Sequence, residues 1–275
     1  MYLAHWQLRE APYRNAIDPR YFFQSLTHEE ALARLQFLID GRHRAGLLLG
    51  DSGTGKSLVL EVLAGQLARH GQRVAKFSLV GLDKTELLSR LAASWGLNPQ
   101  PGDSACDLWR MLLDTIAVQN LEGHGSVILL DDADEATPEV LAQVLRVAQT
   151  DVATNPAATL ILAARPARVT HLGNRLLELA DLRVDILPWN VDDTQHYLEH
   201  GLARAGRHAL TFTPEAIALL AELSQGVPRN TVQLAELSLV AAAGQELAAV
   251  DAATILGVYQ ELGVVERVVE ASLAS

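Results

Sequence analysis

The sequence predicts an α/β protein whose parallel five-stranded sheet is covered by helices and followed by a small C-terminal helical domain. Short apolar runs alternate with segments of helical periodicity over the first two thirds of the chain, as in strand–helix–strand units. The first apolar run enters a glycine-rich turn, and beyond Pro188 only helical patterns follow. We therefore expect an α/β domain over residues 1–188, with an N-terminal segment 1–40, and a helical domain over residues 189–275.

Composition places the chain among ordinary globular proteins. Hydrophobic residues make up 49% of its 275 residues and charged residues 20%, which excludes a disordered chain. The formal net charge of -11 disfavours broad, non-specific binding of nucleic acid or anionic lipid, although a local basic patch stays open. The single cysteine, Cys106, excludes an internal disulfide framework and a cysteine-rich zinc site. Without a signal-peptide pattern or an apolar run of roughly 20 residues, we expect a cytoplasmic protein with no membrane span.

The first helix is expected to begin at Thr27, whose hydroxyl suits a helix cap and precedes acidic residues in the first turn. Apolar residues at helical spacing continue it. These are Ala31, Leu32, Leu35, Leu38 and Ile39.

Five short apolar runs are expected to form the strands of the sheet. They cover residues 45–49, 74–79, 127–130, 159–163 and 183–187. Helical periodicity separates them over residues 58–69, 84–95, 105–120 and 138–149. Strands that alternate with helices in this way predict parallel pairing with helices on both faces.

The helical domain has two recognisable helix starts. Thr213 is a cap followed by Pro214 at the first helical position, where proline is favoured. Asp251 is expected to cap a later helix.

A phosphate-binding loop is the strongest functional signal. The run has the Walker A spacing, in which a glycine is followed after four residues by Gly-Lys-Ser. Glycines let backbone N–H groups surround phosphate oxygens, and the next helix directs its N-terminal N–H groups at the same anion. Lys56 is expected to bind the β- and γ-phosphates of ATP, and the Ser57 hydroxyl to ligate Mg²⁺. The expected nucleotide-binding residues are Gly50, Asp51, Ser52, Gly53, Thr54, Gly55, Lys56, Ser57 and Leu58.

Two aspartates follow the apolar run 127–130. Asp131 would stand at the C-terminal end of a strand, where ligands bind in open α/β sheets, and is the expected Mg²⁺ carboxylate of a Walker B motif. Asp132 stands where a glutamate usually polarises the attacking water, but its side chain is one methylene shorter. The alternative for Asp132 is a capping aspartate for the next turn.

Residues at both ends of the chain complete a family pattern. Outside the Walker motifs they are Met1-Tyr2-Leu3, Pro12-Tyr13, Asp18-Pro19-Arg20-Tyr21-Phe22, His28, Ala31-Leu32, Arg34-Leu35, Phe212-Thr213-Pro214-Glu215-Ala216 and Gly226-Val227-Pro228-Arg229-Asn230. With these residues the chain resembles, over nearly its whole length, the AAA+ ATPases of the ExeA type (general secretion pathway protein A). It is more distantly similar to the TniB and MuB transposition ATPases.

The resemblance implies a P-loop AAA+ core in which the nucleotide is held between the α/β domain and a helical lid. Arg229 would then be the sensor arginine that reaches the γ-phosphate from the lid, which suits a guanidinium on a domain that closes. The alternative is an arginine at a helix start that pairs with a surface acid. The segment Tyr21 to His28 would pack near the adenine, or its aromatic residues attach the first helix to the core.

The chain departs from this family at two places. Relatives carry a glutamine after the fourth strand, where this chain has Arg165, which would contact phosphate, act at a subunit interface or be an exposed structural residue. A Gln-Arg pair before the fifth strand is replaced by Glu178-Leu179. A trans-acting arginine would then be Arg175 or Arg183.

The leading hypothesis is an AAA+ ATPase that couples ATP binding and hydrolysis to the conformation or assembly of protein partners, with a secretion or envelope role implied by the resemblance. Its expected catalytic residues are Lys56, Asp132 and Arg229, its cofactor is Mg²⁺, and an ATP-dependent homo-oligomer is expected. The alternative is a slow or non-hydrolysing ATP-dependent switch or scaffold, for example in transposition or another DNA transaction. A small-molecule kinase is disfavoured because such enzymes usually insert their lid within the sheet domain.

Overall fold

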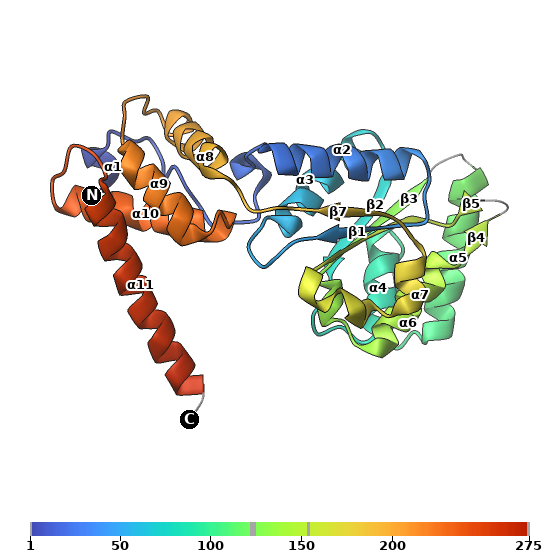
Figure 1. The fold of residues 1–275 in the computed structure, drawn as a ribbon. Helices are drawn as coiled ribbons and strands as arrows, with labels where there is room; N and C mark the ends of the chain where they lie inside the picture. Colours follow the sequence, from blue (N-terminus) through green and yellow to red (C-terminus); the bar gives the residue numbers. More distant parts are fainter. Residues whose placement is uncertain (1, 122–124, 153–154, 274–275) are drawn as a thin grey trace. The chain divides into compact units, whose positions relative to one another are not determined.

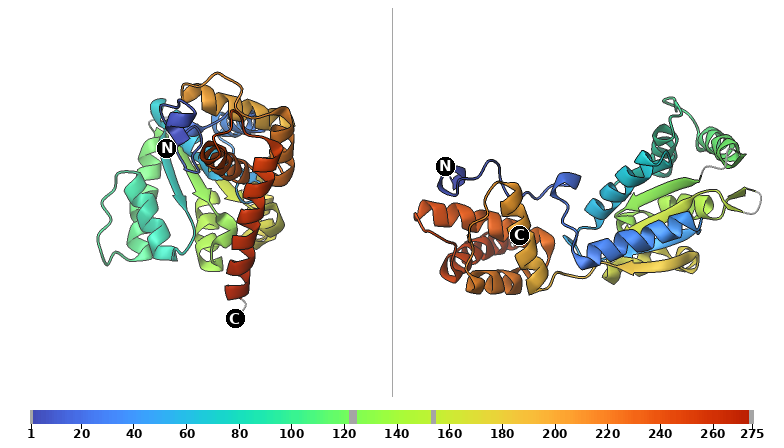
Figure 2. Two further views of the ribbon diagram at one scale, coloured as in Figure 1. Left: turned by 90° about the vertical axis from the view of Figure 1, so that its left-hand side faces the viewer. Right: turned by 90° about the horizontal axis from the view of Figure 1, so that it is seen from above.

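A computed structural model describes residues 2–121, 125–152 and 155–273 of the chain. It consists of two compact units. Residues 28–186 form the first, which we call the sheet unit; residues 1–27 together with 187–275 form the second, the helical unit. Figures 1 and 2 show the elements of each unit along the chain.

The sheet unit contains a five-stranded sheet in which every neighbouring pair is parallel. In spatial order the strands are β2 (Arg73–Ser78), β3 (Ser126–Asp131), β6 (Thr159–Ala164), β1 (Ala45–Leu49) and β7 (Ala180–Asp185). The three central strands β3, β6 and β1 are buried along their whole length. Burial on both faces explains why these strands read as continuous apolar runs.

Helices cover both faces of the sheet, as the sequence predicted. In Figure 1 one face carries α2 (Leu26–Asp40) and α3 (Lys56–Arg69). The other carries α4 (Lys84–Ser94), α5 (Ala105–Leu121), α6 (Pro138–Ala148) and α7 (Asn174–Glu178). The predicted α/β fold with a parallel five-stranded sheet is therefore confirmed.

The sequence analysis did not predict several short elements that connect the strands and helices. They are the 3-10 helices η2 (Ala133–Glu135) and η3 (Pro166–Leu172), and the antiparallel pair β4 (Asp151–Val152) and β5 (Asn155–Pro156). The last strand of the sheet also begins three residues earlier than expected, at Ala180 instead of Arg183. Elements of two to seven residues are too short to develop a hydrophobic period, and edge strands such as β7 are exposed on alternate positions.

Within its described residues, the helical unit contains six helical segments. They are α1 (Tyr2–His5), η1 (Pro19–Tyr21), α8 (Val191–Arg204), α9 (Pro214–Ser224), α10 (Pro228–Gly244) and α11 (Ala252–Leu273). The two caps predicted in this unit are confirmed, since the Thr213 hydroxyl accepts from the Ala216 N–H and Asp251 accepts from the Thr254 N–H. The cap predicted at Thr27 is wrong, because α2 already begins at Leu26 and the Thr27 hydroxyl accepts from the Leu187 N–H.

The N-terminal segment corrects the expected domain division, which placed residues 1–40 with the sheet. Residues 1–27 belong to the helical unit, where Trp6 and Tyr13 are each only 1% exposed. The Trp6 indole donates to the Leu239 carbonyl of α10 at 2.9 Å, and the Tyr13 hydroxyl donates to the Leu198 carbonyl of α8 at 2.8 Å. An irregular aromatic segment has no period that could reveal which apolar surface it covers, so its partner is decided by these contacts.

Candidate nucleotide-binding site

The glycine-rich loop joins β1 to α3, as expected of a phosphate-binding loop. Gly53 and Gly55 have φ values of 86° and 100°, in the left-handed region that glycine adopts without strain. At Gly50 a Cβ atom would lie 2.6 Å from Thr54 Oγ1 and 3.1 Å from the Ile186 carbonyl oxygen. The compact turn therefore requires glycine at Gly50, and positive φ favours it at the other two positions.

The loop closes on itself through the backbone between Asp51 and Thr54. The Asp51 carbonyl accepts from the Thr54 hydroxyl at 2.9 Å and from the Thr54 N–H at 3.3 Å. The turn leads directly into α3. The first N–H groups of a helix have no carbonyl partner in a preceding turn, so they are available to bind an anion. The Leu58 N–H donates to the Gly55 carbonyl at 3.0 Å, so this amide is used inside the helix and its expected nucleotide contact stays a prediction.

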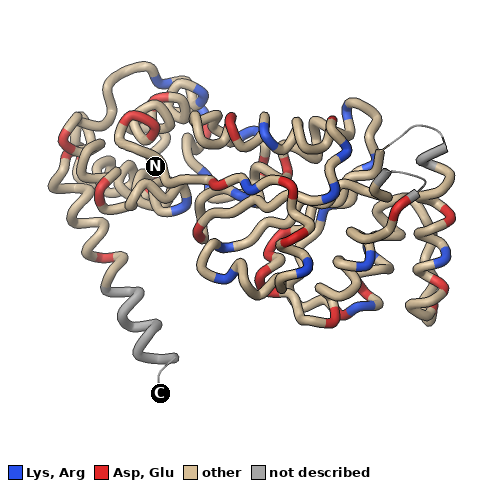
Figure 3. The backbone as a smooth tube through the Cα atoms, turned by 45° about the vertical axis from the view of Figure 1, so that its right-hand side comes forward, with Lys and Arg blue, Asp and Glu red and all other residues tan. Residues whose placement is uncertain are grey.

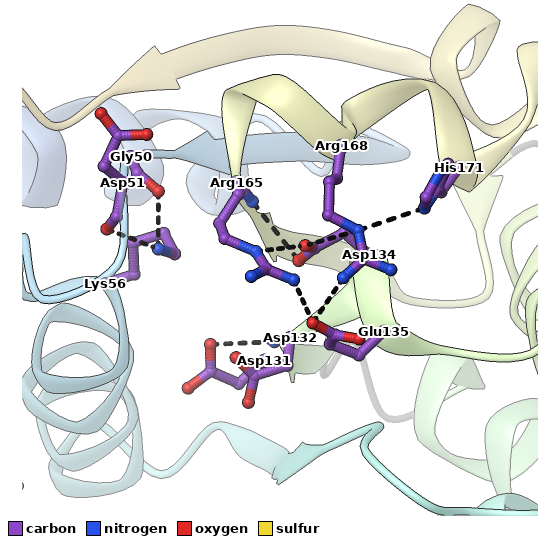
Figure 4. A network of polar contacts seen from close by, with 10 residues as sticks. All are labelled: Gly50, Asp51, Lys56, Asp131, Asp132, Asp134, Glu135, Arg165, Arg168 and His171. Carbon is purple, nitrogen blue, oxygen red and sulfur yellow. Dashed lines mark hydrogen bonds and ion pairs between the residues drawn. The ribbon is translucent and has the colours of Figure 1, made fainter. Parts of the chain in front are cut away.

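Lys56 is folded over the loop, and its residue is only 8% exposed. Its ammonium donates to the Gly50 carbonyl at 2.6 Å and to the Asp51 carbonyl at 3.0 Å (Figure 4). Burial lowers the pKa of Lys56 below its usual value, while the nearby carboxylates, Asp131 foremost, act in the opposite direction. The ammonium thus lies where it can exchange backbone carbonyls for phosphate oxygens.

The strands β1, β6 and β3 are neighbours and run parallel, so their C-terminal ends lie at one edge of the sheet. Asp131, at the end of β3, therefore lies at the same edge as the loop that follows β1. It is only 7% exposed, and one of its carboxylate oxygens accepts from the Asp132 N–H at 3.0 Å. Ser57 is the second residue of α3, beside Lys56. A buried carboxylate and a hydroxyl at one sheet edge are the oxygen ligands that Mg²⁺ prefers, so Asp131 and Ser57 fit the metal that the sequence implies.

Asp132 adopts a left-handed backbone conformation, with φ 51° and ψ 40°. Its carboxylate accepts a hydrogen bond from the Ser78 hydroxyl at 2.9 Å. Ser78 is the last residue of β2 and stands opposite Asp131 in the strand register. The sequence analysis missed Ser78, and the available signal was its position near the end of the strand expected over residues 74–79.

Arg165 follows β6 and is engaged by carboxylates at the same sheet edge. Its Nε donates to Asp134 Oδ2 at 2.7 Å, and its terminal nitrogen pairs with Glu135 (Figure 4). Arg168 of η3 also donates to Glu135, at 2.6 Å. Asp134 is buried, and its hydrogen bond raises the pKa of Arg165. Asp134, Glu135 and Arg168 had not been singled out, because their pairing depends on η2 and η3.

The remaining predicted arginines lie on three different elements. Arg183 of β7 donates to both carboxylate oxygens of Asp185, at 2.8 to 3.0 Å. Arg175 is exposed on α7. Arg229 is the second residue of α10 and belongs to the helical unit, so its role as a lid sensor stays a prediction.

The comparisons with known proteins agree with this geometry. Residues 39–172, which span the loop, Asp131 and Arg165, match the family described as AAA domain. The general secretion pathway protein A of Aeromonas hydrophila is 29% identical over 247 residues, which are 88% of this chain but only 45% of that protein. This chain therefore spans less than half the length of that relative.

Solved structures show the same fold at low sequence identity. The Cdc6p structure from Pyrobaculum aerophilum has a TM-score of 0.68 at 20% identity, covering 85% of this chain and 67% of that one. The Aeropyrum pernix ORC1 protein in complex with DNA has a TM-score of 0.66 at 18% identity, covering 93% and 69%. Residues 39–172 are therefore similar to the AAA domain family, and the chain is similar to general secretion pathway protein A of Aeromonas hydrophila.

Proposed function

We propose that the chain is an Mg²⁺-dependent ATPase that couples ATP binding and hydrolysis to the conformation or assembly of protein partners. The observation that carries this proposal is the buried ammonium of Lys56 inside a glycine loop, at the sheet edge where the buried carboxylate of Asp131 also lies. A buried cation that donates to backbone carbonyls gains charge-assisted hydrogen bonds when phosphate arrives. The match of residues 39–172 to the AAA domain family and the similarity to an Aeromonas secretion protein support the proposal.

Each residue of the site has a separate task in this proposal. The loop N–H groups from Gly50 to Ser57 bind phosphate oxygens, and Lys56 neutralises charge on the β- and γ-phosphates. Ser57 and Asp131 would hold Mg²⁺, which would stabilise negative charge on the transferred phosphoryl group. Asp132 orients the attacking water and accepts its proton.

The proposed coupling runs through the helical unit. Arg229 would bind the γ-phosphate, and losing that phosphate would remove its charge partner and release the lid. A secretion or envelope role follows from the Aeromonas relative and is proposed at the level of the family. No helix in the described ranges is long and apolar enough to cross a membrane. A cytoplasmic location stays a prediction.

Steady-state phosphate release from the purified chain tests the enzymatic proposal. We expect turnover that requires Mg²⁺, is abolished in Lys56→Ala and is reduced about 10²- to 10⁴-fold in Asp132→Asn, because a positioned general base contributes that much. Arg34→Ala, which removes an exposed arginine of α2, is the control and should keep normal turnover. Tight ATP binding without any phosphate release would contradict the proposal.

A slow or non-hydrolysing ATP-dependent switch is the second candidate. It is favoured by the Asp132 carboxylate, which is short and held by Ser78, and by Arg165, whose charge is engaged by Asp134 and Glu135. A role in a DNA transaction would agree with the DNA complex of the ORC1 neighbour. Figure 3 shows acidic and basic positions interspersed within each unit. Salt-dependent retention of DNA by the ATP-bound chain would support this version, and its absence would exclude it.

A further inference from the structure

The imidazole of His28 packs against the phosphate loop. His28 belongs to α2, at the beginning of the sheet unit, and is only 3% exposed. Its Nε2 atom lies 2.9 Å from the carbonyl oxygen of Thr54. Because a carbonyl oxygen can only accept, Nε2 must carry the hydrogen and donate it to the loop.

The same ring packs against the last glycine of the loop. A Cβ atom on Gly55 would lie 2.7 Å from His28 Nε2, closer than real side-chain contacts allow. The ring therefore occupies the space that a side chain at Gly55 would need. The peptide between Thr54 and Gly55 is thus held by one hydrogen bond and by close packing from the same residue.

Peptide geometry determines what this contact does. The carbonyl of Thr54 and the N–H of Gly55 belong to one planar trans peptide and point in opposite directions. A donor that holds the Thr54 carbonyl towards α2 consequently directs the Gly55 N–H away from α2. Glycine rotates its backbone more easily than any other residue, so a peptide beside Gly55 needs such an external restraint.

We propose that His28 is a positioning residue of the phosphate loop: its imidazole fixes the Thr54–Gly55 peptide so that the Gly55 N–H is presented to a phosphate group. This inference rests on the proposed function of the loop. It assigns the residue to phosphate binding, whereas the resemblance led us to expect the segment Tyr21 to His28 near the adenine. A buried imidazole on a loop carbonyl favours the phosphate role.

Two variants separate the hydrogen bond from the packing. His28→Phe keeps a flat ring but has no donor, and His28→Gln restores an N–H donor on a flexible side chain. His70→Phe, at the exposed C-terminal end of α3, is the matched control for a histidine replaced by phenylalanine. His28→Leu serves as a second variant without a donor if the phenylalanine variant does not fold.

Calorimetric titration with inorganic tripolyphosphate and with ADP provides the readout. We expect His28→Phe to weaken both ligands by the same factor of about ten, because one preorganised amide contact to a charged group is lost. His28→Gln should recover most of this loss, and His70→Phe should bind as the unmodified chain does.

The titrations distinguish a failure of the His28 assignment from a failure of the nucleotide site. Unchanged tripolyphosphate binding in His28→Phe, or equal losses in His28→Phe and His28→Gln, overturns the role of His28. A loss confined to ADP would move His28 to adenine recognition and also overturn it. An unmodified chain that binds neither ligand would refute the nucleotide site itself, and with it the inference.

Discussion

The backbone at Asp132 suits an aspartate at the position where the sequence analysis expected a glutamate. Its φ of 51° lies in the left-handed region, where aspartate and asparagine are enriched because their short side chains bond locally. The Ser78 hydroxyl then fixes the carboxylate at 2.9 Å. We infer that this local conformation, and not a lost function, selects the shorter side chain.

Changing the length of the side chain at Asp132 should change the rate of ATP hydrolysis. Asp132→Glu is expected to raise phosphate release severalfold, since the added methylene brings the carboxylate closer to the water, while costing about 1 kcal/mol of stability in the left-handed conformation. Ser78→Ala should raise turnover about two- to tenfold by removing one restraining hydrogen bond. Both are measured by phosphate release at saturating ATP.

The matched control is Ser94→Ala, which removes a hydroxyl that bonds a helix carbonyl in α4 and should leave turnover unchanged. If Ser78→Ala instead lowers turnover, the Ser78 hydroxyl holds Asp132 in the orientation that catalysis needs. The expectation that this hydrogen bond slows phosphate release would then be wrong.

The spacing of the loop residues was enough to predict that Lys56 begins the helix after β1, and the apolar run 127–130 was enough to predict that Asp131 ends a strand. The partners of these residues could not be predicted. Ser78 reaches the site from β2 and His28 from α2, and their side chains belong to common types with many possible roles. Only the register of β2 on β3 and the packing of α2 single them out.

At the scale of elements, α10 holds the N-terminal segment through Glu236. Its carboxylate accepts hydrogen bonds from the Tyr2 hydroxyl and from the Tyr13 backbone N–H. Its second oxygen, Oε2, is buried and has no hydrogen-bond partner among the described residues. Burial raises the pKa of Glu236 above its usual value, which the two hydrogen bonds only partly offset.

A raised pKa in the folded state means that the folded protein binds this proton more readily than the unfolded chain. The contribution of Glu236 to stability is therefore fully present below its unfolded pKa, about 4.3, and is lost as the pH rises through the folded pKa. We expect Glu236→Gln to be at least as stable as the unmodified chain at pH 7 and to lose that relative advantage as the pH falls towards 4.5.

Thermal unfolding at several pH values measures this difference. Glu222→Gln, at an exposed position on α9 of the same unit, is the control and should show a pH-independent difference from the unmodified chain. A glutamine variant at Glu236 that is destabilised equally at pH 7 and pH 4.5 would show that the carboxylate acts through its hydrogen bonds alone.

At the scale of the whole molecule, the expected ATP-dependent homo-oligomer would place an arginine of one subunit at the nucleotide of its neighbour. Arg183 is engaged by Asp185 and Arg165 by Asp134 and Glu135, whereas Arg175 is exposed on a short helix and forms no ion pair within the described part of the chain. Arg175 is therefore the strongest candidate for a contact in trans. Such a contact would make assembly depend on the bound nucleotide.

Light scattering after size exclusion tests this expectation on the full chain. We expect a larger mass with a non-hydrolysable ATP analogue than with ADP, and a smaller shift for Arg175→Ala than for the control Arg183→Ala. The same mass in both nucleotide states would exclude nucleotide-dependent assembly, and equal behaviour of the two variants would exclude Arg175.

The sequence by itself determined the parallel sheet, the helices on both faces and the position of the phosphate loop, because burial on both sides makes strands continuously apolar and the loop needs glycines at set intervals. Only the tertiary structure decided that residues 1–27 join the helical unit, that Ser78 bonds Asp132 and His28 bonds the loop carbonyl of Thr54, and that Arg165 is paired with acids. These are contacts between residues far apart in the chain. They depend on the directions of individual side chains, for which sequence periodicity carries no signal.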